Sequence, residues 1–148
     1  MNKSLTPNWP FLKMHGLGND FVILDWRKAA LDLHAALITG LADRHRGVGF
    51  DQLAVIESGT GDAHLRFFNA DGSVSAACGN ATRCIARYLM DELEKSSLHL
   101  TTDRGALRAE TSPDGSVSIN MGQPLLTWQD IPLSEAMETL VLPIKGDP

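Results

Sequence analysis

The segment from Phe67 to Leu93 constrains the fold more than any other part of the sequence. It starts as an apolar strand and then enters the run Asn69–Ser73, which is rich in turn-forming residues. Apolar side chains then recur at the three- and four-residue steps of one helical face, at Ala81, Cys84, Ile85, Tyr88, Leu89 and Leu93. The sequence therefore predicts a strand, a turn and an amphipathic helix over residues 80–94.

A thiol stands at the predicted start of this helix, in the run Cys78-Gly79-Asn80, where Asn80 is a good N-cap residue. The first backbone N–H groups of a helix lack partners within the helix, and the helix dipole places partial positive charge there. This end therefore attracts a carboxylate and favours a thiolate over a thiol. A cysteine that follows two alanines is more often a small buried side chain, and that alternative stays open for Cys78. The flanking turn residues favour the chemical interpretation.

Composition excludes several classes of function. A chain of 148 residues with 43% hydrophobic content suits one domain with an ordinary core. The net charge of -5 comes from mixed acidic and basic residues, so we expect neither a nucleic-acid nor a membrane partner.

The two cysteines are six positions apart, so on a helix their sulfurs would point in different directions and we expect no disulfide between them. No cysteine or histidine residues have zinc-ligand spacing. Free thiols and the lack of an export signal predict a cytoplasmic protein.

The rest of the sequence predicts strands with hairpin connections. Alternating and apolar patterns predict strands over residues 11–14, 21–25, 53–56, 63–68, 98–102, 106–111 and 116–121, and a helix over 31–44 with His34, Leu37, Ile38 and Leu41 on its packed face. The last two strands form a hairpin around Ser112–Gly115. Several strands around one apolar helix make an α+β domain. The basic run Arg44–Arg46 is explained by the dipole at the end of the first helix.

The glycine-rich loop Gly16–Asp20 could be a plain tight turn or could let the backbone approach a small ligand. A second glycine-rich loop, Gly47–Gln52, leads into the strand over 53–56. Gln52 could bind a substrate or satisfy the backbone of its own loop, and the residues alone leave these alternatives even.

Four segments in this order resemble the diaminopimelate epimerases: KMHGLGNDF from Lys13, GFDQL from Gly49, FFNADGS from Phe67 and CGNATRC from Cys78. The resemblance covers nearly all of the chain but only the N-terminal half of such an enzyme. It implies a curved, mostly antiparallel sheet wrapped around a central helix. Prolines and weak periodicity predict an extension over residues 1–10 and a loosely structured segment over 122–148, on either side of a domain core over 11–121. The resemblance implies that a second domain of similar fold follows the last segment.

The resemblance also implies a site for LL- and meso-diaminopimelate. Its residues would be Cys78 as an acid and base, Asn19, Gln52 and Asn69 as side chains that bind the substrate, and the backbone amides of Gly79 and Asn80 for a carboxylate. The family often has glycine at the position of Ala81, which puts only the closeness of ligand approach in question.

Epimerisation needs two proton carriers, and Cys84 is a poor second candidate because it shares the apolar face with Ile85 and Tyr88. The resemblance implies that the partner cysteine comes from the second domain. The 148-residue chain alone should therefore not catalyse epimerisation. No phosphate-binding loop and no distinctive lysine for a Schiff base are present, so we expect no cofactor and no metal. Full-length relatives are often homodimers.

Two alternatives compete with a half-enzyme of lysine and peptidoglycan precursor biosynthesis. The first keeps the fold and changes the substrate, as in the proline racemases or the phenazine-biosynthesis isomerases. The second is a binding module for a small molecule that has no catalytic activity. A dedicated binder should saturate with diaminopimelate, whereas half of a catalytic pocket should bind it weakly or not at all.

Overall fold

The computed structural model describes residues 8–28, 32–131 and 133–143. Within these ranges the chain forms eight strands and two helices. In chain order they are β1 (Leu12–Gly16), β2 (Asn19–Asp25), α1 (Ala35–Ala42), β3 (Gln52–Glu57), β4 (Ala63–Asn69), β5 (Val74–Ser75), α2 (Gly79–Leu93), β6 (Ser97–Thr102), β7 (Gly105–Thr111) and β8 (Val117–Asn120).

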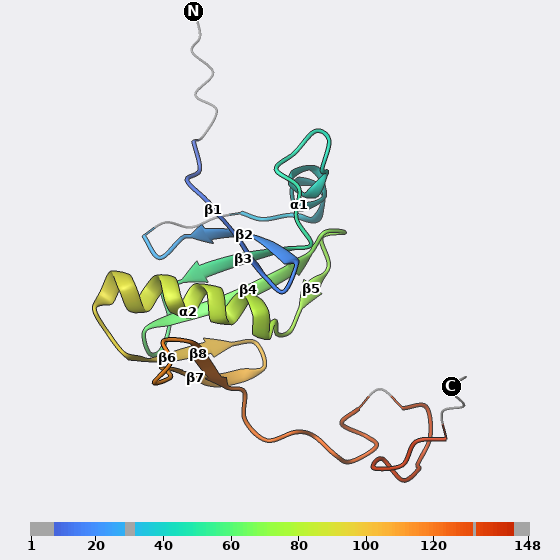
Figure 1. The fold of residues 1–148 in the computed structure, drawn as a ribbon. Helices are drawn as coiled ribbons and strands as arrows, with labels where there is room; N and C mark the ends of the chain where they lie inside the picture. The colour runs from blue at the N-terminus through green and yellow to red at the C-terminus, as the bar shows by residue number, and fades with distance from the viewer. Residues whose placement is uncertain (1–7, 29–31, 132, 144–148) are drawn as a thin grey trace, which may run out of the picture.

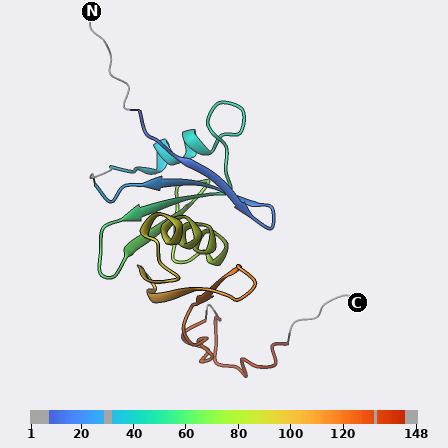
Figure 2. The same ribbon diagram turned by 60° about the vertical axis from the view of Figure 1, so that its left-hand side comes forward.

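All the strands belong to one sheet that curves around α2 (Figures 1 and 2). The order is β1-β2-β3-β4-β6-β7-β8, and β5 pairs with β4 as a side branch. The β2–β3 and β4–β6 pairs are parallel, while the other pairs are antiparallel. The expected α+β fold, a mostly antiparallel curved sheet around a central helix, is confirmed.

Strand alternation divides the buried side chains between the two faces of the sheet. On β2, Phe21 and Ile23 face α2, whereas Val22 and Leu24 lie on the face covered by α1. The α2 face holds the larger core, to which the helix contributes Ile85 and Leu89, both fully buried. Burying these side chains supplies the hydrophobic free energy that fixes α2 in the concave face of the sheet.

Most of the predicted elements are present, with small shifts at their ends. The first helix is shorter than predicted, since it begins at Ala35 rather than at residue 31, and residues 29–31 lie outside the described ranges. The prediction that His34 packs inward is wrong. This side chain is exposed and caps α1, because its Nδ1 accepts a hydrogen bond of 3.2 Å from the backbone N–H of Leu37.

The chain leaves the sheet after β8 and continues as an irregular segment (Figure 1). No helix or strand forms in the described residues between Gly122 and Pro143. Part of the predicted extension over residues 1–10 falls outside the described ranges. Among the described helices, none combines the length and the apolar character that a bilayer-spanning segment needs.

Candidate functional site

The N-terminus of α2 is built around Cys78, which is the N-cap residue of the helix. Its backbone is extended, with φ -146° and ψ 102°, and its sulfur accepts a hydrogen bond of 3.5 Å from the backbone N–H of Ala81. Asn80, which is the stronger N-cap residue by type, lies inside the first turn instead. The half-buried sulfur therefore lies at the positive end of the helix, as the sequence predicts.

Two backbone amides beside this sulfur are available to a ligand. Those of Gly79 and Asn80 have no hydrogen-bond acceptor among the residues that the structure describes. The third amide, at Ala81, donates to the Cys78 sulfur. The fourth, at Thr82, donates to the Cys78 carbonyl oxygen at 2.9 Å. Free amides at a helix N-terminus suit a carboxylate.

Three strands bring polar side chains to this end of the helix. The strands β2 and β3 begin there and β4 ends there, as Figure 1 shows on the side where α2 starts. Asn19, Gln52 and Asn69 each stand two residues from a side chain of the core that packs on α2. Because strand side chains alternate, all three lie on the α2 face of the sheet. These three polar side chains therefore lie at the edge of the apolar core, next to the start of α2.

Hydrogen bonds hold these side chains in place. The Asn19 Oδ1 atom lies 4.0 Å from Cys78 Sγ, within reach of the thiol hydrogen. Gln52 donates from Nε2 to Asn69 Oδ1 at 3.0 Å across the β3–β4 pair, and Asn69 donates from Nδ2 to Ser73 Oγ at 3.0 Å. The side chain of Asn80 accepts a hydrogen bond from Arg83. Asn19 and Cys78 therefore form one contact, and Gln52 and Asn69 form another.

Both thiols are free, and both partly buried cysteines pack against the core. Cys84 differs from Cys78 in its hydrogen bond, since its sulfur donates to the backbone oxygen of His15 at 3.6 Å. Burial raises the pKa of the Cys84 thiol, which disfavours the reactive thiolate. The interpretation of Cys84 as a packing residue agrees with this position.

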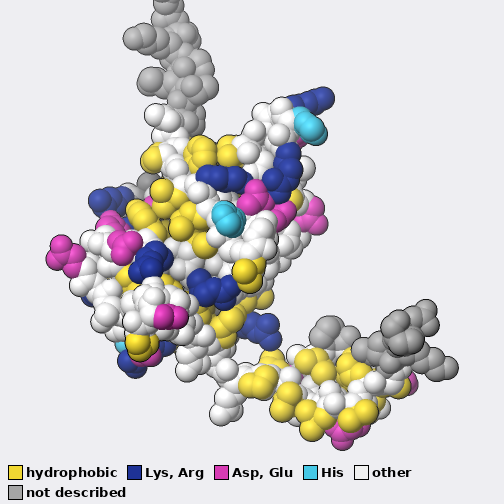
Figure 3. Space-filling view, in the orientation of Figure 1, with side chains coloured by type: hydrophobic (Ala, Val, Ile, Leu, Met, Phe, Trp, Pro, Cys, Tyr) yellow, Lys and Arg dark blue, Asp and Glu magenta, His cyan; other side chains and the backbone are white. Residues whose placement is uncertain are grey.

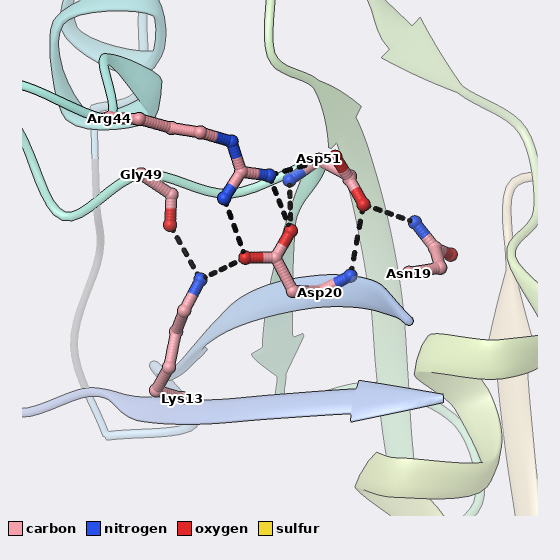
Figure 4. Close-up of polar contacts among 6 residues, drawn as sticks. All are labelled: Lys13, Asn19, Asp20, Arg44, Gly49 and Asp51. Carbon is pink, nitrogen blue, oxygen red and sulfur yellow. Dashed lines mark hydrogen bonds and ion pairs between the residues drawn. The ribbon is translucent and has the colours of Figure 1, made fainter. Parts of the chain in front are cut away.

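Sequence reasoning missed a cluster of charged residues next to Asn19 (Figure 4). The carboxylates of Asp20 and Asp51 share the guanidinium group of Arg44, at 2.7 Å and 2.9 Å. The assignment of Arg44 to the dipole of α1 was therefore incomplete, since the helix ends at Ala42 and the side chain turns to these carboxylates. Arg44 lowers the pKa of Asp20 well below its ordinary value, and Lys13 adds to the effect.

Comparison with known proteins agrees with this geometry. A family model described as diaminopimelate epimerase matches residues 11–127 of the chain. The chain belongs to the diaminopimelate epimerase family. A curated diaminopimelate epimerase from Acidiphilium cryptum is 53% identical over 134 residues, which are 90% of this chain and 48% of that protein. The diaminopimelate epimerase of Rhodospirillum centenum is 46% identical over 93% of this chain and 48% of its own length.

Two solved structures share the fold of this chain. The crystal structure of a hydroxyproline epimerase from Agrobacterium vitis matches with a TM-score of 0.57 at 16% identity, and the match covers 75% of this chain and 40% of that one. A phenazine biosynthesis protein of the PhzF family from Bacillus anthracis matches with a TM-score of 0.50 at 22% identity, over 75% of this chain and 38% of that one. The chain spans about half the length of the diaminopimelate epimerases it matches.

Proposed function

We propose that this chain forms one half of a diaminopimelate epimerase, which interconverts the LL and meso forms of its substrate in lysine biosynthesis. The observation that carries the proposal is the position of Cys78 at the start of α2, in contact with Asn19 and beside two amides that have no acceptor among the described residues. Membership of the diaminopimelate epimerase family supports the choice of substrate. In this proposal residues 11–121 are the N-terminal half of the enzyme.

The proposed reaction is a proton transfer without a cofactor. The substrate carboxylate docks on the amides of Gly79 and Asn80, and the Cys78 thiolate removes the proton from the adjacent α-carbon. The electron pair left by that C–H bond delocalises toward the carboxylate, whose negative charge the helix N-terminus stabilises. A thiol on the opposite side of the carbon donates a proton, which inverts the centre. Each turnover moves one proton onto Cys78 and one proton from the second thiol.

The second thiol in this proposal belongs to a second domain. Cys84 is a poor source of it, because its sulfur donates to the His15 carbonyl oxygen and its partly buried side chain packs against the core. The segment beyond β8 supports a further packing partner, since it exposes the apolar side chains of Leu125, Leu126, Leu140 and Val141 (Figure 3). We propose that residues 122–148 connect to this domain and that the enzyme acts in the cytoplasm, where its thiols stay reduced.

A chimera tests the proposal. This chain replaces the matching 134 residues of the Acidiphilium cryptum protein, and the product is assayed for interconversion of LL- and meso-diaminopimelate in deuterated water. We expect both epimerisation and incorporation of deuterium at the α-carbon. A chimera that folds like the intact Acidiphilium protein but lacks both activities would reject the proposal. The 148-residue chain alone should show no turnover.

Substitution of the two cysteines in the chimera separates their roles. We expect Cys78→Ala to reduce turnover by about 10²–10⁴-fold, which is the usual contribution of a positioned acid or base. Cys84→Ala is the matched control and should leave kcat near that of the parent chimera. If the Cys78→Ala protein still exchanges the α-proton at the parent rate, Cys78 has no place in the mechanism.

A further inference from the structure

The carboxylate of Asp51 lies next to the amide nitrogen of Asn19 (Figure 4). The sulfur of Cys78 lies near the amide oxygen of the same side chain. Its Oδ2 atom accepts hydrogen bonds from Asn19 Nδ2 at 3.2 Å and from the backbone N–H of Asp20 at 3.0 Å. Its Oδ1 atom accepts one from Arg44 Nη2 at 2.9 Å. The protein thus supplies three donors to this one carboxylate.

The chemistry of these groups determines which way the Asn19 amide turns. An ionised carboxylate can only accept hydrogen bonds, so the NH₂ group of Asn19 must face Asp51. The amide oxygen then points to the other side, where Cys78 Sγ lies 4.0 Å away. We propose that Asp51 is a positioning residue, which holds the Asn19 amide so that its oxygen, and not its nitrogen, faces the site. The catalytic consequence of this orientation rests on the proposed function.

Asp51 is itself fixed by reciprocal contacts with β2. The backbone N–H of Asp51 donates to Asp20 Oδ1 at 3.0 Å, while the backbone N–H of Asp20 donates to Asp51 Oδ2 at the same distance. Arg44 bridges both carboxylates, and Lys13 donates to Asp20 Oδ2 at 2.6 Å. The backbone N–H of Asp20 and the guanidinium of Arg44 thus hold the Asp51 carboxylate, so it can impose an orientation on a side chain that has two rotatable bonds.

This orientation selects the kind of group that Asn19 can bind. An amide oxygen that faces the site accepts a hydrogen bond from a thiol or from the ammonium group of an amino acid. An amide nitrogen in the same place would meet the ammonium group with a second donor. Asp51 therefore favours substrates that carry an ammonium group near Cys78.

Asp51→Asn in the 148-residue chain tests the orientation without any assay of activity. The substituted side chain can donate as well as accept, so it no longer specifies which end of the Asn19 amide faces it. The Asn19 side-chain signals are assigned by NMR as those missing from an Asn19→Ser variant. We expect Asp51→Asn to shift them, whereas Arg44→Gln, which removes the ion pair but keeps the carboxylate, should leave them nearly in place.

The unsubstituted chain gives a test that does not depend on how any variant folds. The Asn19 NH₂ protons should show nuclear Overhauser contacts to the backbone N–H of Asp20, since both donate to the same oxygen of Asp51. Contacts from these protons to the β-hydrogens of Cys78 instead would overturn the proposal. So would unchanged Asn19 signals in folded Asp51→Asn.

The chimera tests the consequence for catalysis. We expect Asp51→Asn to reduce kcat/KM by about 10- to 100-fold, mainly through a higher KM, because a ligand contact is misdirected. Asp62→Asn is the matched control, since Asp62 also accepts a backbone hydrogen bond, from His99 at 2.8 Å, and pairs with Lys95. It should leave KM unchanged. Equal effects of both substitutions on KM would refute a positioning role for Asp51. An inactive parent chimera would instead refute the proposed function, and the NMR result would then decide the orientation of the Asn19 amide.

Discussion

Two turns have the same local structure, and only one of them contacts another element near the site. Comparing the same substitution in both turns measures how much that contact contributes to the free energy of unfolding. Gly72 and Gly115 have φ angles of +84° and +80°, in the left-handed region that glycine tolerates. Each donates its N–H to the residue three positions earlier at 2.9 Å. Each glycine also follows an aspartate. The Oδ1 atom of that aspartate accepts a hydrogen bond of 2.9 Å from the backbone N–H of the residue after the glycine. The turns differ mainly in what surrounds them.

An alanine methyl group has a neighbour at only one of these glycines. A Cβ atom at Gly72 would lie 2.7 Å from Cα and Cβ of Ala35 and 2.9 Å from its backbone oxygen, whereas at Gly115 nothing lies within 4 Å. Both substitutions cost about 1–2 kcal/mol for a left-handed backbone. Gly72→Ala adds overpacking against backbone, which costs about 1–3 kcal/mol more. We therefore expect losses of about 1–2 kcal/mol for Gly115→Ala and about 2–5 kcal/mol for Gly72→Ala.

Urea unfolding of the two variants, compared with the parent chain, gives these free energies directly. The difference between them isolates the contact between the β4–β5 turn and the start of α1. That contact also matters for the site, because the turn holds Asn69 through its hydrogen bond to Ser73. Variants of equal stability would show that α1 does not lie on this turn, and the reasoning from the Cβ distances would fail.

Three further predictions concern the core, the charged cluster and the helix start. Leu89→Ala should lower the free energy of unfolding by about 2–5 kcal/mol, because this side chain is fully buried between α2 and the sheet; a loss below about 1 kcal/mol in urea unfolding would contradict that packing. The pKa of Asp20 is lowered in the folded chain by Arg44, so the resulting stabilisation is present above the unfolded pKa and is lost as pH falls through the folded value. Unfolding measured from pH 5 downward should therefore show a smaller loss of stability in Asp20→Asn than in the parent, and equal slopes would refute the assignment. Thr82→Val should cost about 0.5–1.5 kcal/mol, since the buried hydroxyl donates to the Cys78 carbonyl oxygen at 2.8 Å; thermal unfolding checks this, and an unchanged midpoint would mean that the hydrogen bond contributes nothing.

The fold could be predicted from the sequence because most of its information is local. Apolar alternation marked the strands, and the helical spacing over 80–94 marked α2, whose observed bounds are Gly79–Leu93. The start moved by one residue because the capping atom is the Cys78 sulfur. Residue type ranks asparagine above cysteine as an N-cap, and only the conformation shows which side chain reaches the Ala81 amide.

The site could be predicted only in part, because its contacts join distant segments. The family motifs named Asn19 and Cys78, and the structure brings them together across 59 positions. Nothing local indicated that the backbone N–H groups of Asp20 and Asp51 each donate to the carboxylate of the other residue, since this contact depends on the parallel pairing of β2 with β3. Parallel pairs need a long connection, so their register cannot be deduced from one short turn.

Under the proposed function, the same contacts explain how this chain's half of the pocket can be arranged without the second domain. Asn19 is oriented by Asp51, Gln52 by Asn69, and Cys78 by the amide of Ala81, and every one of these partners lies within this chain. Their geometry therefore does not depend on a substrate or on a second domain. A site organised in advance loses less entropy when the reacting groups meet, and it keeps its dipoles aligned with the charge that develops. Under the proposed function, a second domain would therefore contribute the second proton carrier and the exclusion of water, and not the arrangement of the residues in this chain.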